Sequence, residues 1–392
     1  MKTLSRFIAL SIIPIVSILL ALFIGAIIII LSSLDTEGSL NLLLPIVAYE
    51  SLFEGATGVS FLNVEDGAIA LGFSIELERA VRNVTNTLAA TAPLILTGLA
   101  VGLGFKGGLF NIGGTGQVLV GGFLAALVGA AVAGLPAPLA VTVALLAGCL
   151  GGAFYGFIPG ALKAFSGAHE VVTTIMLNSL AAFVLIGLVN DIFRIQGPTF
   201  ARTADVGNAK LPLWFDQDGI FQMAIALTLA ALAYVLIYRT TLGFEIRTTG
   251  ANPSAARYAG MSPRRLTVLT LSMCGLFAGL AGAIEILSLG YYPAVFGTTI
   301  GFAGITVALL GRANPIGIVL AALLLGGMRA GAPAMQITAD IPIEIIDLIQ
   351  GLILLFLAAE VVIRRLLRIR AERVTPGELQ TVSRSYGQGT AA

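Results

Sequence analysis

Side chains that could carry out catalysis are few in this sequence. His169 is the one histidine among 392 residues, so neither a Ser-His-Asp triad with a choice of bases nor a metal site of several histidines is available. Both cysteines, Cys149 and Cys274, lie inside apolar stretches, where we expect small packing residues rather than a disulfide or metal ligands. We therefore expect no catalytic residue, no metal and no cofactor.

Nucleotide-binding signatures are out of place or incomplete. The string from Gly102 through Gly104 to Gly107 satisfies G-x-G-x-x-G, but the dinucleotide fingerprint needs a preceding strand and an acidic residue about 20 positions later. This string lies in an apolar region instead. None of the four lysines completes a G-x-x-x-x-G-K-[ST] loop, so we expect no ATP binding of that kind.

The composition is that of a membrane protein. Apolar residues make up 57% of the chain and charged residues 11%, whereas soluble domains carry roughly 25% charged residues. Too few charges remain to cover a water-exposed surface. The net charge of +1 provides no basic face for a run of phosphates, so we expect no nucleic-acid partner.

Apolar runs predict an all-α, polytopic bundle of about ten transmembrane helices, each needing about 20 residues. The runs lie near residues 7–31, 86–105, 116–134, 138–160, 171–190, 219–237, 266–288, 299–310, 315–332 and 343–362. Arginines cluster in residues 238–265 and 364–373, Lys2 and Arg6 precede the first run, and residues 35–84 are acidic. Because positive loops stay inside, both termini are expected in the cytoplasm, which ten or eight spans would satisfy.

The same features divide the chain into four parts. Residues 1–34 are expected to form a signal-anchor helix, because the apolar run is longer than the core of about 7 to 15 residues in a cleaved signal peptide. Residues 35–84 form an acidic extracytoplasmic segment, and residues 85–366 form a membrane core that contains the cytoplasmic loop 238–265. Residues 367–392 are expected to be a flexible cytoplasmic tail.

Glycines predict two features of the membrane core. The glycine-rich stretch 104–122 is interpreted as a broken segment, of the kind at which transporters bind substrate, or alternatively as a tightly packed helix pair. Glycines at fourfold spacing elsewhere predict close helix contacts. These packing positions are Gly148, Gly152, Gly156, Gly160, Gly275 and Gly279.

Polar residues inside the spans are the second group of candidates. Glu285 is expected either on a pathway or near the outer interface, since a charge at a helix centre costs about 2.5 to 3.5 kcal/mol on insertion scales. Thr174 and Asn178 lie one turn apart and form a polar stripe. Such groups can hydrogen-bond a polyhydroxylated substrate, or equally hold two helices together.

The cytoplasmic loop contains a short helix with its own start and stop signals. Asn252 is expected to be the N-cap, Pro253 the first helical residue and Gly260 the terminator. A helix this short is unstable alone, so a docked partner would explain it; a solvated turn is the alternative. We expect Ala256→Glu to abolish that docking without unfolding the chain.

Five stretches in order resemble the permeases of ABC importers in the branched-chain amino acid, ribose and nucleoside group. They are Gly108-Leu-Phe-Asn-Ile-Gly-Gly-Thr-Gly-Gln117, Glu170-Val-Val-Thr-Thr-Ile-Met-Leu-Asn178, residues 250–260, residues 274–285 and residues 301–317. The first two are most similar to permeases for purine nucleosides, with simple-sugar permeases close behind. Gly114 and Thr115 depart from the Ala-Glu usual in the family.

The resemblance implies a permease core in the cytoplasmic membrane, a substrate path, and a coupling loop that seats in the ATP-binding subunit. The loop residues are Gly250, Asn252, Pro253, Ala255, Ala256, Arg257, Tyr258 and Gly260, and the path candidates are Asn111, Gln117, Thr174, Asn178 and Glu285. It also implies a second related permease, identical or different, an extracytoplasmic substrate-binding lipoprotein, and ATP hydrolysis by the partner. The expected cargo is a nucleoside, with simple sugars or branched-chain amino acids as alternatives. An ion-coupled secondary transporter is the rival class.

Overall fold

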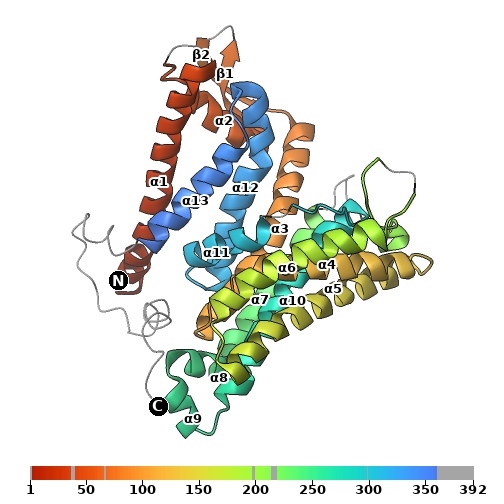
Figure 1. Ribbon diagram of the computed structural model, residues 1–392. Coiled ribbons are helices and arrows are strands. Elements are labelled where there is room, and N and C mark those ends of the chain that lie inside the picture. Colours follow the sequence, from red (N-terminus) through yellow and green to blue (C-terminus); the bar gives the residue numbers. More distant parts are fainter. Residues whose placement is uncertain are drawn as a thin grey trace. The chain divides into compact units, whose positions relative to one another are not determined.

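A computed structural model describes residues 2–36, 40–65, 68–196, 199–212, 219–297 and 299–359 (Figure 1). These residues form two compact units. Unit 1 takes its described residues from 1–91, 215–220 and 321–372, and unit 2 from 92–214 and 221–320. The predicted tail, 367–392, lies outside the described residues.

Helices dominate both units, which confirms the predicted all-α class. They are α1 (Lys2–Thr36), α2 (Leu44–Thr57), α3 (Leu77–Lys106), α4 (Gly114–Ala131), α5 (Ala137–Ala161), α6 (Glu170–Asp191), α7 (Gly219–Arg239), α8 (Thr241–Ala251), α9 (Pro253–Tyr258), α10 (Pro263–Leu289), α11 (Ile300–Leu310), α12 (Pro315–Ala339) and α13 (Glu344–Ala358). A π-helical turn, Leu162–Ser166, extends α5, and a 3-10 turn covers Gly207–Ala209.

Proline and glycine set several of these helix ends. Pro45 and Pro263 lie in the first turns of α2 and α10, where a missing N–H costs no helical hydrogen bond. Gly58 (φ 72°) and Gly290 (φ 93°) end the same helices in the left-handed conformation, which glycine adopts without strain. Both helices therefore begin and end where the sequence signals them.

Eight of the described helices are long and apolar enough to cross a membrane, which confirms a multi-pass protein. They are α1 (through Ile12–Ser33), α3, α4, α5 with its π-helical turn, α6, α7, α10 and α12. The predicted span at 299–310 is wrong, because the 11 residues of α11 rise only about 16 Å against a hydrocarbon core of about 30 Å. The last predicted span is described only as far as residue 359, where α13 has 15 residues.

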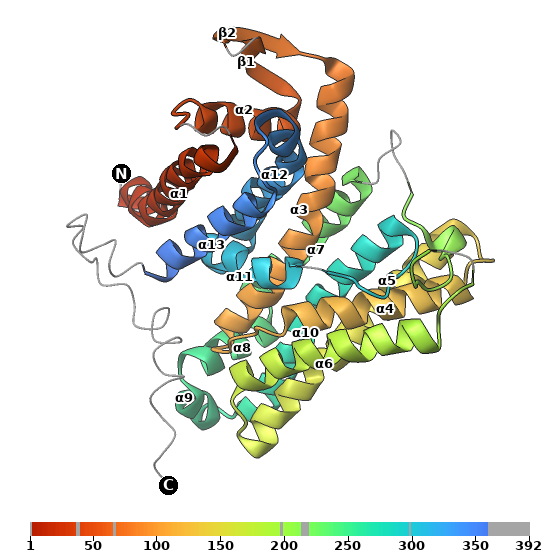
Figure 2. The ribbon, with the colours of Figure 1, turned by 45° about the horizontal axis from the view of Figure 1, so that its top comes forward.

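Unit 2 is built around α10, which packs along α5 and α4 (Figure 2). The predicted packing glycines line these contacts: Gly152 lies against the backbone of Gly275 and Gly279, and Gly156 against Leu271 and Gly275. A methyl group on most of these glycines would lie under 3 Å from another helix's backbone or side chain. Small residues thus allow the helix backbones to touch, as expected for helices packed in lipid.

Unit 1 contains a β-hairpin that the sequence analysis did not predict. Strands β1 (Val59–Glu65) and β2 (Ala68–Ile75) pair antiparallel, with a register shift between Ser60 and Leu62. In the sequence, an Asp-Gly pair between two runs rich in apolar and aromatic residues is the usual hairpin signal, and it was available at residues 66–67. The acidic segment is therefore not a simple loop, because it also contains α2 and the start of α3.

Candidate functional site

The predicted break is present between α3 and α4, but it is shorter than expected. It covers residues 107–113. Of the other glycines in the stretch 104–122, Gly104 lies inside α3, and Gly114, Gly116, Gly121 and Gly122 lie inside α4. Gly108 adopts φ 68°, and the Leu109 N–H donates to the carbonyl of Gly104 (2.9 Å), which closes the end of α3. The glycines of α4 serve contact rather than flexibility, since Gly121 and Gly122 lie against α10.

Asn111 and Gln117 close a reciprocal amide pair across this break. The Asn111 Nδ2 donates to Gln117 Oε1 (3.0 Å), and the Gln117 Nε2 donates to Asn111 Oδ1 (3.2 Å). Asn111 Oδ1 also accepts the Gly113 N–H (3.1 Å). Both side chains are only 1% exposed, so their amides are satisfied inside the protein rather than by water.

Asn178 ties α6 to the same break. Its Oδ1 accepts the Gly116 N–H (2.8 Å), and its Nδ2 donates to the Ile112 carbonyl (2.9 Å). The first N–H groups of a helix have no partner within their own helix, so Asn178 caps α4 from outside. One amide thus ties α6 to the end of the break and to the first turn of α4.

Thr174 lies one turn before Asn178 and is fully buried. Its hydroxyl donates to the Glu170 carbonyl of its own helix (2.7 Å), and its side chain lies close to Gly113. The structure therefore brings four of the five path candidates together. Their hydrogen bonds are made within the protein, which is the arrangement of interhelical polar contacts; a role in a substrate path stays a prediction.

Glu285 lies in α10 rather than in the elements that form that network, one turn after Gly282, which contacts Val118 of α4. It is half-buried in the last two turns of α10, before the helix ends at Leu289, whereas the amide network joins α4 to α6. Whether it borders a path stays a prediction.

The predicted coupling loop, 238–265, contains a pair of helices rather than one. Asn252 accepts the N–H groups of Ser254 and Ala255 (3.1 Å each), with Pro253 first in α9, and Gly260 (φ 81°) follows the helix end. The sequence analysis missed α8, although Thr240 is a good cap residue before an apolar pattern. In the structure the Thr240 hydroxyl accepts the Gly243 N–H (3.1 Å).

The outer side of α9 is open to solvent, whereas one residue anchors its inner side. Tyr258 is 95% exposed, and Ala255 and Arg257 are exposed beside it. Ala256 is completely buried. The expectation that Ala256→Glu leaves the fold intact is therefore corrected, because a carboxylate at this position would lose its hydration or displace the helix.

Gly250 connects this helix pair to the break. Its Cα lies so close to the α3–α4 turn that a methyl group would fall under 3 Å from backbone atoms of Lys106, Gly107 and Gly108. Gly107 also faces Ile246 of α8 and Thr270 of α10. The end of α8, which leads into the exposed α9, and the buried amide network therefore adjoin opposite ends of the same seven-residue break, 107–113.

The sequence analysis did not predict the ion pairs, two of which join helical segments. Lys163, in the π-helical turn, pairs with Glu170 at the start of α6, whose side chain is 3% exposed. In unit 1, Arg329 lies within α12, 20% exposed, with its Nη2 3.9 Å from Asp347 Oδ1 of α13. The arginine inside predicted span 315–332 was itself a signal, since charges inside spans are costly.

An aromatic cluster in unit 2 joins the segment that follows α6 to the segment that follows α10. Phe123 of α4 packs edge-on against Phe193 and Tyr292, with centroids 5.6 and 5.4 Å apart. Arg202 lies over the Tyr291 ring at 4.3 Å. Burial raises the pKa of the Tyr292 phenol, because desolvation disfavours the phenolate. The cluster thus packs the segment after α6, with Phe193 and Arg202, against the segment after α10, with Tyr291 and Tyr292.

The described part of the chain contains no group of three or more His, Cys, Asp or Glu residues able to hold a metal ion. Its described side chains offer hydrogen bonding and packing rather than bond-making chemistry.

Comparison with known proteins places this arrangement in a family. Residues 83–358 match the model of the branched-chain amino acid transport system permease component. The chain is 37% identical to a guanosine ABC transporter permease of Bacillus subtilis over 83% of this chain and 95% of that protein. It is 33% identical to a nucleoside ABC transporter permease of Lactococcus lactis (91% and 92%) and 34% identical to a glucose ABC transporter permease of Haloferax volcanii (78% and 84%).

Proposed function

We propose that this chain, which belongs to the family of branched-chain amino acid transport system permease components, forms the path for a nucleoside in an ATP-driven importer. Family membership makes it a multi-pass permease of an ABC importer in the cell membrane, not itself catalytic. The nucleoside is the proposed part.

Similarity to a guanosine permease is the observation that supports a nucleoside as the transported substrate. The match of 37% extends over 95% of that relative, and the nucleoside permease is matched over 91% of this chain. The glucose permease, at 34%, keeps a simple sugar as the second candidate.

The proposed partner on the cytoplasmic side is a separate ATP-binding subunit that docks on α9. Three observations support this docking site. The helix is capped at both ends, it presents Tyr258 to solvent, and Gly250 lies against the turn after α3. A push on α9 would therefore be transmitted to the 107–113 break through backbone contact.

Two more partners complete the proposal. A second permease, identical or related, would supply the other half of the path, and an extracytoplasmic lipoprotein would deliver the nucleoside. Asn111, Gln117, Thr174 and Asn178 are proposed to shape the path from the α4–α6 side. A nucleoside entering there would have to compete with the hydrogen bonds that these residues already make.

The test is uptake by proteoliposomes that contain the permease with its ATP-binding subunit and binding lipoprotein. We expect ATP-dependent uptake of radiolabelled guanosine that unlabelled nucleosides inhibit and glucose does not. Uptake of radiolabelled glucose without uptake of guanosine would establish the sugar alternative. Uptake driven by an ion gradient without the ATP-binding subunit would overturn the importer mechanism.

A further inference from the structure

Helix α2 contacts α1 far from the end of its membrane span. The Tyr49 hydroxyl donates to the Leu22 carbonyl of α1 (2.6 Å), and Leu22 lies in the middle of the span Ile12–Ser33. At about 1.5 Å per residue, Leu22 is about 16 Å along α1 from Ser33. This distance is about half the thickness of a bilayer core of about 30 Å.

Two other helices contact α2 well inside their own ends. The Thr87 hydroxyl of α3 donates to the Ala56 carbonyl (2.8 Å), about 15 Å along α3 from its first residue, Leu77. Gly331 of α12 lies directly against the backbone of Leu52, about 12 Å from the end of α12 at Ala339. The 14-residue α2 therefore lies well below the ends of three helices that are long enough to span the membrane.

The side of α2 that faces away from these helices is apolar and exposed. Leu43, Ile46 and Phe53 are 53%, 50% and 42% exposed. An aromatic ladder continues from Phe53 to the hairpin, with centroids 5.7 Å apart to Phe61 and 5.8 Å from Phe61 to Phe73. Phe73, at 69%, is the most exposed ring of the ladder.

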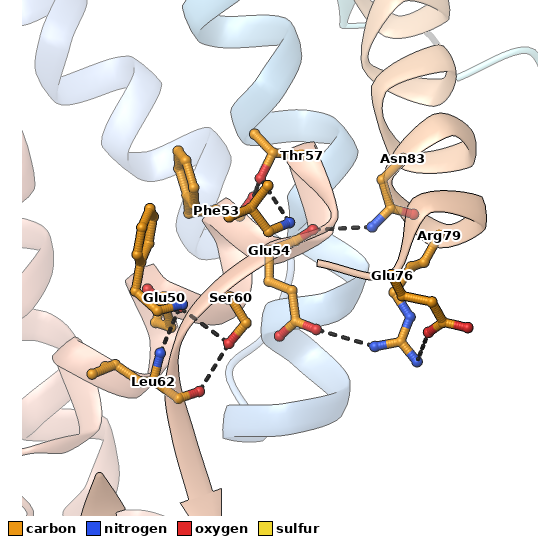
Figure 3. A network of polar contacts seen from close by, with 11 residues as sticks. Glu50, Phe53, Glu54, Thr57, Ser60, Leu62, Glu76, Arg79 and Asn83 are labelled. Carbon is orange, nitrogen blue, oxygen red and sulfur yellow. Dashed lines mark hydrogen bonds and ion pairs between the residues drawn. The ribbon is translucent and has the colours of Figure 1, made fainter. Parts of the chain in front are cut away.

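Three acidic side chains of this segment, Glu50, Glu54 and Glu76, contact partners within unit 1 (Figure 3). Glu50 Oε1 accepts the N–H groups of Phe61 and Leu62 and the Ser60 hydroxyl. Glu54 pairs with Arg79 at 3.2 Å, and Arg79 also pairs with Glu76 at 3.4 Å. Because the Glu50 carboxylate is hydrogen-bonded to three groups of β1, it can lie in less polar surroundings than a solvated carboxylate. Glu54, Glu76 and Arg79 instead keep 34%, 65% and 50% of their side chains exposed.

We propose that α2 and the hairpin form a lipid-binding anchor in the leaflet opposite the cytoplasm. The exposed side of α2 lies against the acyl chains, and Phe61 and Phe73 lie at the boundary with the headgroups. We infer that lipid covers this surface because α2 lies at the level of Leu22 in the span of α1. At that level α1 also exposes an apolar stripe, which includes Leu19, Phe23 and Ile27. Aromatic residues favour this boundary, and interfacial helices bind it through an apolar side.

Fluorescence quenching by brominated lipid tests the anchor. In a Trp214→Phe background, which removes the one native tryptophan, Phe73→Trp places the probe on the ladder, and Tyr258→Trp places a control on α9. Each full-length variant is reconstituted in nanodiscs of phosphatidylcholine or of phosphatidylcholine brominated near the top of its acyl chains. We expect bromination to lower the emission of the ladder probe roughly twofold and to leave the control unchanged.

Unquenched emission from the ladder probe would overturn the proposal. A probe that brominated lipid leaves unchanged but that shifts when the binding lipoprotein is added would show a protein-docking surface instead. Phe61→Trp is the second variant. Both tryptophan substitutions keep an aromatic ring, and unchanged thermal unfolding in detergent would show that the fold is intact.

Discussion

Gly250 at the end of α8 lies in backbone contact with Gly108 in the turn that follows α3. A methyl group on either glycine would come under 3 Å from backbone atoms of the other segment, and backbone cannot rotate away as a side chain can. The contact joins the exposed α8–α9 pair to the break that the amide network of Asn111 holds.

Gly250→Ala should therefore impair transport and stability together. Overpacking typically costs about 1 to 3 kcal/mol, so we expect a lower midpoint of thermal unfolding and reduced ATP-dependent uptake. Gly187→Ala in α6 is the matched control, because nothing lies within 4 Å of its added methyl group. Equal behaviour of the two variants would show that the turn accommodates the methyl group.

Tyr258→Ala should weaken binding of the ATP-binding subunit while leaving the permease folded. Tyr258 is 95% exposed, so its removal costs the isolated chain little packing, whereas exposed aromatic side chains often dominate docking surfaces. Co-purification of the two subunits measures the effect, and we expect a loss of roughly tenfold, equivalent to about 1.4 kcal/mol. Tyr258→Phe keeps the ring and should retain most of the binding. Undiminished co-purification of the alanine variant would argue against docking on α9.

Asn178→Ala should destabilise the start of α4. The change leaves the Gly116 N–H and the Ile112 carbonyl without their partner, and an unsatisfied buried group costs about 1 to 3 kcal/mol. Asn208→Ala is the control, since the exposed Asn208 donates to the Leu135 carbonyl where water can replace it. Differential scanning fluorimetry in detergent compares the two, and equal midpoints would contradict a structural role for Asn178.

Glu50→Ala should loosen the hairpin from α2. The carboxylate accepts two backbone N–H groups of β1, so its loss should cost about 1 to 3 kcal/mol. Limited proteolysis at residues 59–75 measures the effect, and faster cleavage is expected. Glu78→Ala, which alters an exposed acid at the start of α3, is the control.

Local signals predicted the parts of the site that depend on neighbours in sequence. Asn252, Pro253 and Gly260 mark the ends of α9 within one short segment, and the fourfold glycine spacing of α5 predicts a surface that another helix can approach. The contact between Gly250 and Gly108 was not predictable in this way. The two residues are far apart in sequence, and glycine has no side chain whose chemistry could indicate its contact partner. The depth of α2 likewise depends on hydrogen bonds to α1 and α3, so the acidic composition of residues 35–84 indicated only an extracytoplasmic segment.

The hydrogen bonds of Asn178 have a consequence for sequence variation at the start of α4. Both of its amide atoms bind main-chain groups, of Gly116 and Ile112, so they specify a backbone shape and no particular side chain. Replacements at residues 114 and 115 are constrained by α11 instead, where Gly301 touches Gly114 and Thr115. Bulk at residue 114 and at residue 301 should consequently trade against each other among related chains, while Asn178 persists unaltered.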